Sequence, residues 1–389
     1  MNAERLLKGF LTLVQIDSVT DHEAAVAAWC KEAFAAAGCA VSEDQTQAQT
    51  GSESGNLIIT LPAKCDNGQP LAGPVRLSEA PAGTRGRLYF SAHMDTVSPG
   101  VGIVPVIADG VIRSAGQTIL GSDDKVGIAT LLELVECLKE SPQAHPEVVI
   151  LLSVGEEGGL KGAAAIDGSD FRGEPCYVID ADGKPGTVII AAPFHDEFTA
   201  LFNGRAAHAG VNPEAGISAI KMAAEAIAAM PLGRIDDLST ANIGTIAGGL
   251  ANNVVAASCT VKGEYRSLDL DRLDDIKSRL GAAMTKAAEQ NGGTVSIDWQ
   301  RAYPGFAVAE DDELVQLVLR VARELGLPAL TRVSGGGSDG NVLAEKGLRP
   351  VVLGSGMSAI HSIDEHLAVQ DLEDLTQLVA GLCWQYQPA

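Results

Sequence analysis

The sequence predicts an α/β protein with two domains: a mostly parallel central sheet flanked by helices, and an inserted ferredoxin-like α/β sandwich. Three observations support this. The 389 residues exceed what one ordinary core accommodates. The run Val148–Val154 is apolar except at Ser153, as in a strand buried on both faces of a parallel sheet. Residues 194–303 follow the order β-α-β-β-α-β of the ferredoxin-like pattern. The predicted domains are 1–193 with 304–389, and 194–303.

Composition and charge narrow the class of function. Hydrophobic residues make up 46% and charged residues 20% of the chain, and no run of 18 apolar residues occurs. The net charge of −22 disfavours nucleic acid and anionic membranes as partners. The seven scattered cysteines include no Cys-x-x-Cys pair, and the N-terminus does not resemble a signal peptide. We therefore expect a cytoplasmic protein in a reducing compartment.

Periodicity and end signals predict the elements in order. The predicted helices are 2–15, 23–37, 126–139, 217–230, 272–290, 312–325 and 369–384. The predicted strands are 56–61, 87–90, 148–154, 175–179, 195–203, 241–247, 253–265, 294–300 and 351–353. Residues 62–86, rich in proline, glycine and small residues, are predicted to form a surface loop.

Two adjacent carboxylates, Glu156 and Glu157, follow the central buried strand. In parallel α/β sheets the ligand lies beyond the carboxyl ends of the strands. Because neighbouring residues point in different directions, one carboxylate can bind a metal while the other transfers a proton. Taken alone, the pair also fits a solvated acidic turn.

Other strand ends and a helix start carry similar side chains. His93 and Asp95 end the strand at 87–90, where Asp95 can orient a metal-bound His93; a core histidine with a capping aspartate is the alternative. Asp123 opens a helix and fits either a bridging metal ligand or a cap, with Asp124 as its competitor. Asp180 ends the strand at 175–179, with Asp182 as competitor, and His361 follows the strand at 351–353.

Together these residues form a candidate dinuclear centre. Two histidines and three carboxylates, without cysteine, suit two divalent ions that share one bridging carboxylate. The predicted ligands are His93, Asp123, Glu157, Asp180 and His361. Any one of these residues could have an ordinary structural role. Five separate segments each place such a residue beside a strand end or a helix start, and this repetition supports the metal-centre interpretation. The donors suit zinc and also accept cobalt or manganese.

The same segments resemble a known family. The strings HMDTV, GSDDKVG and GEEGG, with the strand-end Asp180 and the late His361, resemble the co-catalytic zinc peptidases that include glutamate carboxypeptidase, aminoacylase, acetylornithine deacetylase and peptidase T. The resemblance covers nearly the whole chain in order. GSDDK and GGGSDGN look most like the peptidase T-like members, which are tripeptide aminopeptidases. The lid segment AAHAGVNPEAG looks more like the aminoacylase and carboxypeptidase branches.

The resemblance implies roles for the metal-centre residues. His93 and His361 would each bind one Zn²⁺, Asp123 would bridge the two ions, and Glu157 and Asp180 would complete the sites. Glu156 would be the general base toward a metal-activated water. Asp95 would orient His93.

It also implies roles in the inserted domain, which would act as a lid. His208 would stabilise the oxyanion in its own or a partner subunit's site. Arg266 would clamp a substrate carboxylate, although it also fits an outward strand residue paired with Asp269. Asn253, with a turn residue as the alternative, would help hold the substrate. The backbone of the glycine-rich loop, at Gly335, Gly336 and Ser338, would also help to hold the substrate. His145, His195 and His366 are left as surface or structural residues.

The sequence therefore predicts a dinuclear zinc aminopeptidase that acts on short peptides, most simply tripeptides. The alternative is a deacylase or carboxypeptidase of the same architecture, acting on N-acyl amino acids or dipeptides. A catalytically silent metal- or peptide-binding protein is a remote alternative, because Glu156 is present. The resemblance also implies a homodimer formed through the lid.

Overall fold

The computed structural model describes residues 1–65 and 86–387 and divides the chain into two compact units. The first contains Met1–Ala191, Ala307–Ser334 and Ser338–Ala389, and the second contains Ala192–Phe306 with Gly335–Gly337. The loop predicted at 62–86 lies mostly outside the described residues.

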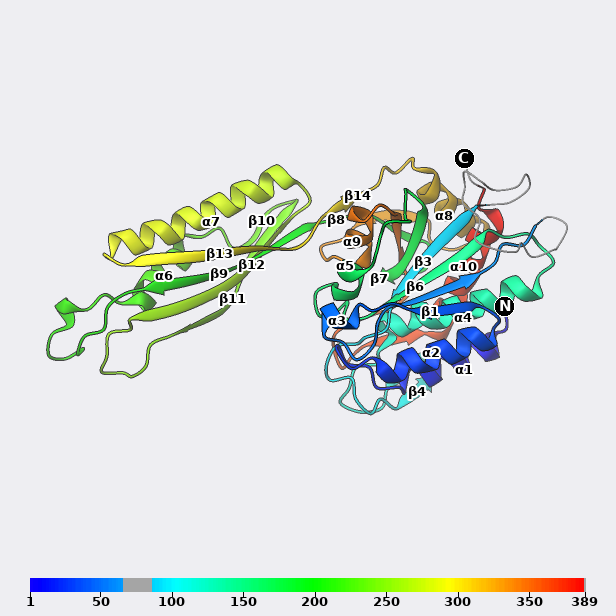
Figure 1. Ribbon diagram of the computed structural model, residues 1–389, viewed down its shortest axis with the longest axis horizontal. Helices are drawn as coiled ribbons and strands as arrows, with labels where there is room; N and C mark the ends of the chain where they lie inside the picture. The colour runs from blue at the N-terminus through cyan, green and yellow to red at the C-terminus, as the bar shows by residue number, and fades with distance from the viewer. Residues whose placement is uncertain (66–85, 388–389) are drawn as a thin grey trace. The chain divides into compact units, whose positions relative to one another are not determined.

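The first unit is built on a nine-stranded sheet among the described residues, in the order β1-β2-β6-β3-β7-β16-β8-β14, with β15 beside β8 (Figure 1). At its centre β3 pairs in parallel with β6 and β7, and β7 with β16, while β1, β2 and β8 add antiparallel pairings. This confirms the mostly parallel sheet. The strands are β1 Ala40–Glu43, β2 Leu57–Leu61, β3 Arg87–His93, β6 Glu147–Ser153, β7 Pro175–Ala181, β8 Thr187–Ala192, β14 Phe306–Ala307, β15 Leu330–Val333 and β16 Arg349–Gly354.

Helices cover this sheet because each has an apolar stripe to bury. In α1, Leu6, Phe10, Leu13 and Val14 are buried, and Asn2 caps the first turn. The long α4 packs against β3 and lies beside α1 and α10. The helices of this unit are α1 Ala3–Val14, α2 Ala24–Ala36, α3 Gln47–Thr50, α4 Ser122–Glu140, α5 Lys161–Ala165, α8 Glu313–Glu324, α9 Asp339–Glu345 and α10 Val369–Gln385.

A small antiparallel sheet in the order β17-β5-β4 completes the first unit. Its strands are β4 Pro105–Ala108, β5 Val111–Ser114 and β17 His366–Ala368. These short strands were not predicted, because none is long enough to show a clear period. β17 follows the loop that carries His361. Because β17 pairs with β5, that loop lies close to the part of the chain that leads from β5 into α4.

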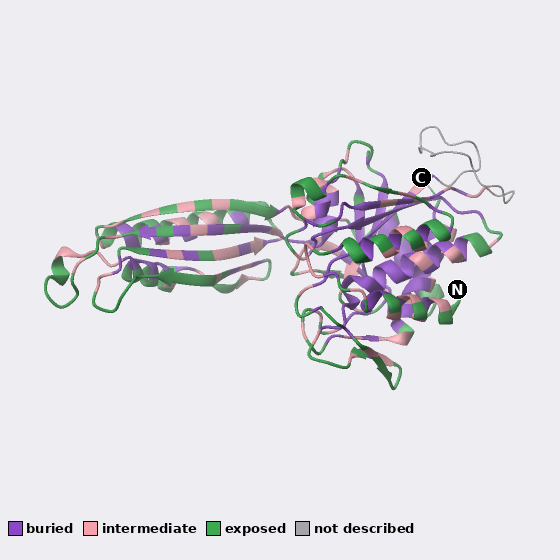
Figure 2. Cartoon of the chain, turned by 60° about the horizontal axis from the view of Figure 1, so that its bottom comes forward, coloured by how far each residue is buried: buried purple, intermediate pink, exposed green. Residues whose placement is uncertain are grey.

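The second unit is a five-stranded antiparallel sheet in the order β10-β11-β12-β9-β13, with α6 and α7 packed on it. Apart from the extra β10, this is the predicted ferredoxin-like arrangement. More buried and more exposed residues alternate along most of β9 and β13 (Figure 2). The strand predicted at 253–265 was wrong at its start, since 253–257 form a loop. The elements are β9 Phe194–Asn203, a 3₁₀ turn Pro213–Ala215, α6 Ala219–Ala229, β10 Gly233–Asp236, β11 Ser239–Gly248, β12 Ser258–Ser267, α7 Leu270–Gln290 and β13 Thr294–Tyr303.

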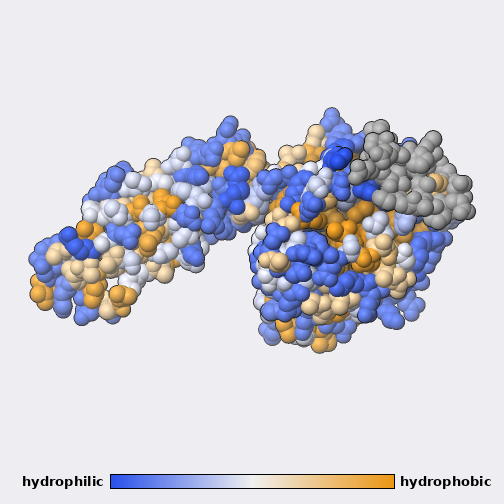
Figure 3. Space-filling view, in the orientation of Figure 1, coloured by the Kyte–Doolittle hydropathy of each residue, from blue (hydrophilic) through white to orange (hydrophobic). Residues whose placement is uncertain are grey.

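The surface mixes hydrophilic and hydrophobic residues on the visible face of each unit (Figure 3). Individual apolar side chains stand out, and Leu250 is 97% exposed. Among the described residues, no helix is both long and apolar enough to cross a bilayer.

Candidate metal centre

Three neighbouring parallel strands deliver side chains to one edge of the central sheet. His93 is the last residue of β3, Asp180 lies near the end of β7, and Glu156 follows β6 by three residues. Because these strands pair in parallel, their carboxyl ends meet at the same edge. The full burial of β6 follows from its unbroken apolar run.

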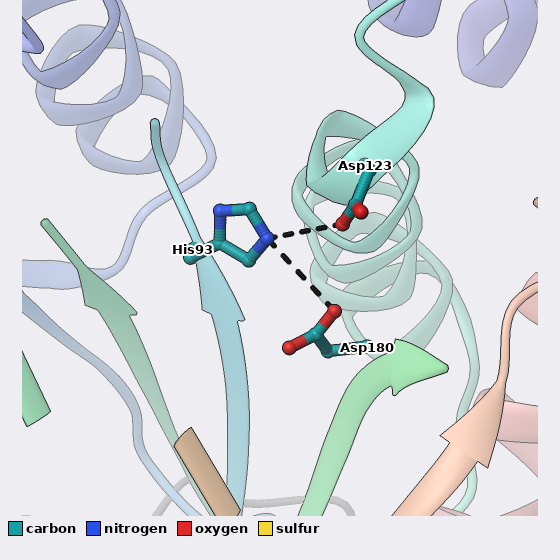
Figure 4. A group of neighbouring side chains, drawn as sticks. All are labelled: His93, Asp123 and Asp180. Carbon is teal, nitrogen blue, oxygen red and sulfur yellow. Dashed lines mark hydrogen bonds and ion pairs between the residues drawn. The ribbon is translucent and has the colours of Figure 1, made fainter. Parts of the chain in front are cut away.

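The His93 imidazole faces two carboxylates (Figure 4). Its Nε2 atom lies 3.1 Å from Oδ1 of Asp123 and 3.8 Å from Oδ1 of Asp180. On its other side, Nδ1 lies 3.0 Å from the backbone oxygen of Asp95. A proton on Nδ1 donated to that oxygen leaves the Nε2 lone pair directed at Asp123 and Asp180.

A second imidazole uses the other oxygen of the same aspartate. Nε2 of His361 lies 3.3 Å from Oδ2 of Asp123 and 2.8 Å from Oε1 of Glu157. The ligand atoms therefore form two groups that share Asp123, and within each group they lie within 4.8 Å of one another. A third such group joins His93, Glu156 and Glu157. All five predicted metal ligands are thus brought together.

Asp123 and Asp124 have different neighbours. Both depart from helical backbone angles at the start of α4, so their side chains point in different directions. The Asp124 carboxylate accepts hydrogen bonds from the backbone N–H groups of His93 and Gly127. A Cβ atom on Gly127 would lie 2.6 Å from that carboxylate, which explains the glycine. Asp124 is therefore occupied by backbone donors, whereas Asp123 faces both imidazoles.

Asp95 connects the His93 strand to the Glu156–Glu157 turn. Its Oδ1 atom accepts from the backbone N–H of Glu156 at 2.9 Å, and its Oδ2 atom accepts from that of Glu157 at 3.1 Å. Oδ2 also accepts from the Thr20 hydroxyl at 2.8 Å. Oδ1 lies 3.4 Å from Nδ1 of His93, farther than the backbone oxygen does. The carboxylate therefore holds the acidic turn, and the backbone oxygen makes the closer contact to the imidazole.

Burial and proximity shift the acidities of this cluster. Burial would lower the pKa of His93, but its hydrogen bonds to Asp123 and Asp95 outweigh burial and raise that pKa well above 6.5. Hydrogen bonds to Asp123 and then Glu157 raise the pKa of His361 to about 10. Burial raises the pKa values of Glu156 and Asp180 well above their ordinary values, and each is raised further by the other acidic groups nearby.

This donor set fits two divalent cations. It offers imidazole nitrogens and carboxylate oxygens only, which suit zinc and also manganese or cobalt. Several acidic groups are buried side by side, and divalent cations would balance their charge. Asp123, with one oxygen toward each imidazole, has the orientation that a shared ligand requires.

The remaining competitor, Asp182, and two histidines that were expected to be surface or structural residues have partners of their own. Asp182, the alternative to Asp180, is exposed and pairs with Arg332 at 3.4 Å. The buried His195 lies 2.8 Å from Oε2 of Glu264, and Nδ1 of the buried His145 lies 2.8 Å from the Pro146 backbone oxygen.

The predicted lid residues lie in the second unit. His208 is exposed, and its Nδ1 atom accepts a hydrogen bond from the backbone N–H of Gly210. The Asn253 backbone oxygen accepts from Ala209, so these two loops lie side by side.

Arg266 has well-defined contacts in the second unit. Its Nε atom lies 2.8 Å from Glu264, and its Nη1 atom donates to the Tyr303 hydroxyl at 3.2 Å and the Gly335 backbone oxygen at 3.4 Å. The suggested pairing with Asp269 was wrong, because Asp269 caps α7. Arg266 is thus brought to the predicted glycine-rich loop, whose Gly335 and Gly336 lie in this unit and whose Ser338 caps α9 in the first.

The sequence reasoning missed four buried acidic or hydroxyl side chains around the centre. Asp339 accepts a hydrogen bond from Ser153 at the end of β6, and burial raises its pKa to about 6. Glu23 accepts from the backbone N–H of Gly155, and Glu365 binds the backbone of the segment that ends in Asp123. No local pattern marks these residues, since each acts on a segment remote in the chain.

Comparison with known proteins bears on the family and the fold of the chain. The model of peptidase family M20/M25/M40 matches residues 89–385. The chain is 40% identical over 384 residues to YqjE, an uncharacterised protein of Bacillus subtilis, with 98% of each chain covered.

Two solved structures have the same fold. One is the aminopeptidase PepT of Bacillus cereus, with a TM-score of 0.88 and 40% identity. The other is a tripeptidase of Staphylococcus aureus, with a TM-score of 0.90 and 36% identity. Each comparison covers 99% of this chain and 98% of the other.

Proposed function

The chain belongs to peptidase family M20/M25/M40, and from this premise we propose that it hydrolyses short peptides by releasing the N-terminal residue of tripeptides. The fold, the donor set and the similarity to PepT and to a tripeptidase over nearly the whole chain support this proposal.

One observation carries the chemistry: the two oxygens of Asp123 face different imidazoles, those of His93 and His361. This arrangement suits a pair of cations bound side by side. His93, Asp123 and Asp180 would hold one cation, and Asp123, Glu157 and His361 would hold the other. When bound, two Zn²⁺ ions would polarise the scissile carbonyl and increase the acidity of water.

The protein residues supply the proton transfer and the geometry. Glu156 accepts the proton of the attacking water and returns it to the leaving amine. Glu156 lies in a group with His93 and Glu157, so its carboxyl group would be beside the cations that those residues hold. The Asp95 carboxylate accepts from the backbone N–H of Glu156 and fixes the turn that carries it, and the Asp95 backbone oxygen accepts a hydrogen bond from Nδ1 of His93, which keeps Nε2 directed at the cluster.

The second unit would recognise the substrate. Arg266 would bind the free carboxylate of the peptide with its guanidinium group. His208 would stabilise the developing oxyanion. Asn253 and the backbone of the glycine-rich loop would help to hold the peptide. The homodimer implied by the resemblance stays a prediction, which light scattering coupled to size-exclusion chromatography would check.

Hydrolysis of a small substrate panel tests the proposal. The panel contains Ala-Ala-Ala, Ala-Ala, a C-terminally blocked tripeptide and N-acetyl amino acids. Each is assayed before chelation, after chelation, and after Zn²⁺, Co²⁺ or Mn²⁺ is restored. We expect chelator-sensitive release of the N-terminal residue from the free tripeptide. Cleavage of N-acetyl amino acids alone would move the activity to the deacylase branch, and no cleavage by the metal-loaded protein would overturn both assignments.

A further inference from the structure

Glu365 is a buried carboxylate that binds an entire backbone segment. It is 1% exposed and lies in the loop before β17. Its Oε2 atom accepts from the N–H groups of Leu120 and Gly121, at 2.8 and 2.9 Å. Its Oε1 atom accepts from the N–H groups of Ser122 and Asp123, at 2.7 and 3.2 Å, and from the Ser122 hydroxyl at 2.5 Å.

These five donors require a carboxylate. They belong to four consecutive residues at the start of α4, where backbone N–H groups lack acceptors within the helix. Leu120, Gly121 and Ser122 are themselves buried, so an unpaired N–H group there would be costly. An ionised carboxylate offers only acceptors, and its two oxygens divide the donors between them. A glutamine would turn an N–H₂ group toward N–H groups, and an aspartate is one methylene too short to reach both ends of the segment.

Glu365 also joins two loops that carry candidate ligands. The segment it binds ends in Asp123, and Glu365 itself follows His361 by four residues. Its own N–H donates to the Ser362 backbone oxygen, which closes a turn that begins at the residue after His361. Oδ2 of Asp123 and Nε2 of His361 lie 3.3 Å apart. One side chain therefore connects the backbone of the shared carboxylate with that of the second imidazole.

We propose that Glu365 is a positioning residue that holds Asp123 and His361 together for the second cation, the one that Glu157 also binds. This inference rests on the proposed function for its metal sites. The first cation depends less on Glu365, because His93 and Asp180 lie on β3 and β7 and are positioned by the sheet itself. Loss of Glu365 should therefore weaken the binding of the second cation more than that of the first.

Metal titration tests this inference without any substrate. Metal-free wild-type protein and the variants Glu365→Gln and Glu133→Gln are titrated with Zn²⁺ by calorimetry in the presence of a competing chelator. Glu133 is the matched control: it is a buried carboxylate on the same α4, and it binds Arg5 and the backbone N–H of Asn2. Both variants are compared in thermal stability.

We expect Glu365→Gln to weaken the first equivalent only slightly and the second about 10–100-fold, the usual effect of losing a residue that orients a ligand. Glu133→Gln should keep both affinities even if its melting temperature falls. Two equivalents of unchanged affinity in Glu365→Gln, or equal weakening of both, would overturn the proposal.

A milder variant covers the case in which Glu365→Gln does not fold. Ser122→Ala removes only the hydroxyl donor to Glu365 and leaves the four N–H groups, so it should weaken the second equivalent a few-fold. If Glu365→Gln does not fold and Ser122→Ala leaves both affinities unchanged, the proposal is also wrong. Failure of the proposed function looks different: the wild type would bind two ions and yet cleave no peptide in the panel.

Discussion

Nε2 of His361 lies 2.8 Å from Oε1 of Glu157, although 204 residues separate the two in the chain. Glu157 follows the central strand β6, and His361 lies in a loop after β16. These two strands are not neighbours in the sheet, since β3 and β7 lie between them. The contact therefore closes the cluster across the edge of the sheet.

Replacement of His361 by alanine should remove one cation and leave the fold intact, because its half-buried ring contributes little to the core. We expect one equivalent of bound metal instead of two, and kcat/KM reduced by at least about 100-fold, more than the loss of a residue that only orients a ligand. Elemental analysis measures the bound metal, and steady-state kinetics measure kcat/KM. His366→Ala is the matched control, because Nδ1 of His366 lies 2.9 Å from the nearby Asp364 backbone oxygen and His366 is not one of the candidate ligands, and two bound equivalents are expected there.

Replacement of Glu156 by glutamine should abolish turnover without removing metal, because the amide cannot accept the proton of the attacking water. The expected fall in kcat is about 10²–10⁴-fold, with KM nearly unchanged. Glu174→Gln is the control: Glu174 is also buried but immediately precedes β7, at the opposite end of that strand from Asp180. If Glu156→Gln retained near wild-type kcat, the general-base role would be wrong.

Arg266→Ala should raise KM for peptides with a free carboxylate. A hydrogen bond to a charged group contributes about 1.5–3 kcal/mol, so we expect an increase of roughly 10–150-fold. KM for the C-terminally blocked tripeptide should rise much less, because that peptide has no free carboxylate. Arg272→Ala serves for comparison, because Arg272 is an exposed arginine of the same unit that pairs with Asp236. Equal changes in KM for free and blocked peptides would show that Arg266 acts only through the structure.

Glu264 should make the second unit sensitive to acid. The His195 imidazole and the Arg266 guanidinium outweigh burial and lower its pKa from 4.5 to about 2. A carboxylate whose pKa is lowered on folding stabilises the folded state above pH 4.5, and this stabilisation is lost as the pH falls toward 2. The difference in unfolding free energy between wild type and Glu264→Gln should therefore be largest above pH 4.5 and shrink below it.

Urea unfolding at a series of pH values measures this difference. Glu289→Gln, an exposed substitution on α7, should show a difference from wild type that is small at every pH. A Glu264→Gln difference that stays constant between pH 6 and pH 2 would contradict the assignment.

Much of the first unit follows from local signals. Buried parallel strands are recognisable from unbroken apolar runs such as Val148–Val154, and amphipathic helices from their period. In such sheets the carboxyl ends of adjacent strands meet, so the sequence was enough to expect His93, Glu157 and Asp180 at one edge of the sheet. The short β4, β5 and β17 could not be expected, because a strand of three or four residues has no measurable period.

The amino-acid sequence predicted the class of fold, a candidate donor set and the segments that carry it. Which atoms lie within reach of one another follows from the three-dimensional packing of those segments. Asp123 and Asp124 are chemically identical neighbours, and the backbone turn at the start of α4 directs one toward two imidazoles and the other toward N–H groups. Glu365 has no distinguishing neighbours in the sequence, yet it binds the segment that ends in Asp123. Side-chain direction depends on contacts between remote segments, which local patterns do not encode.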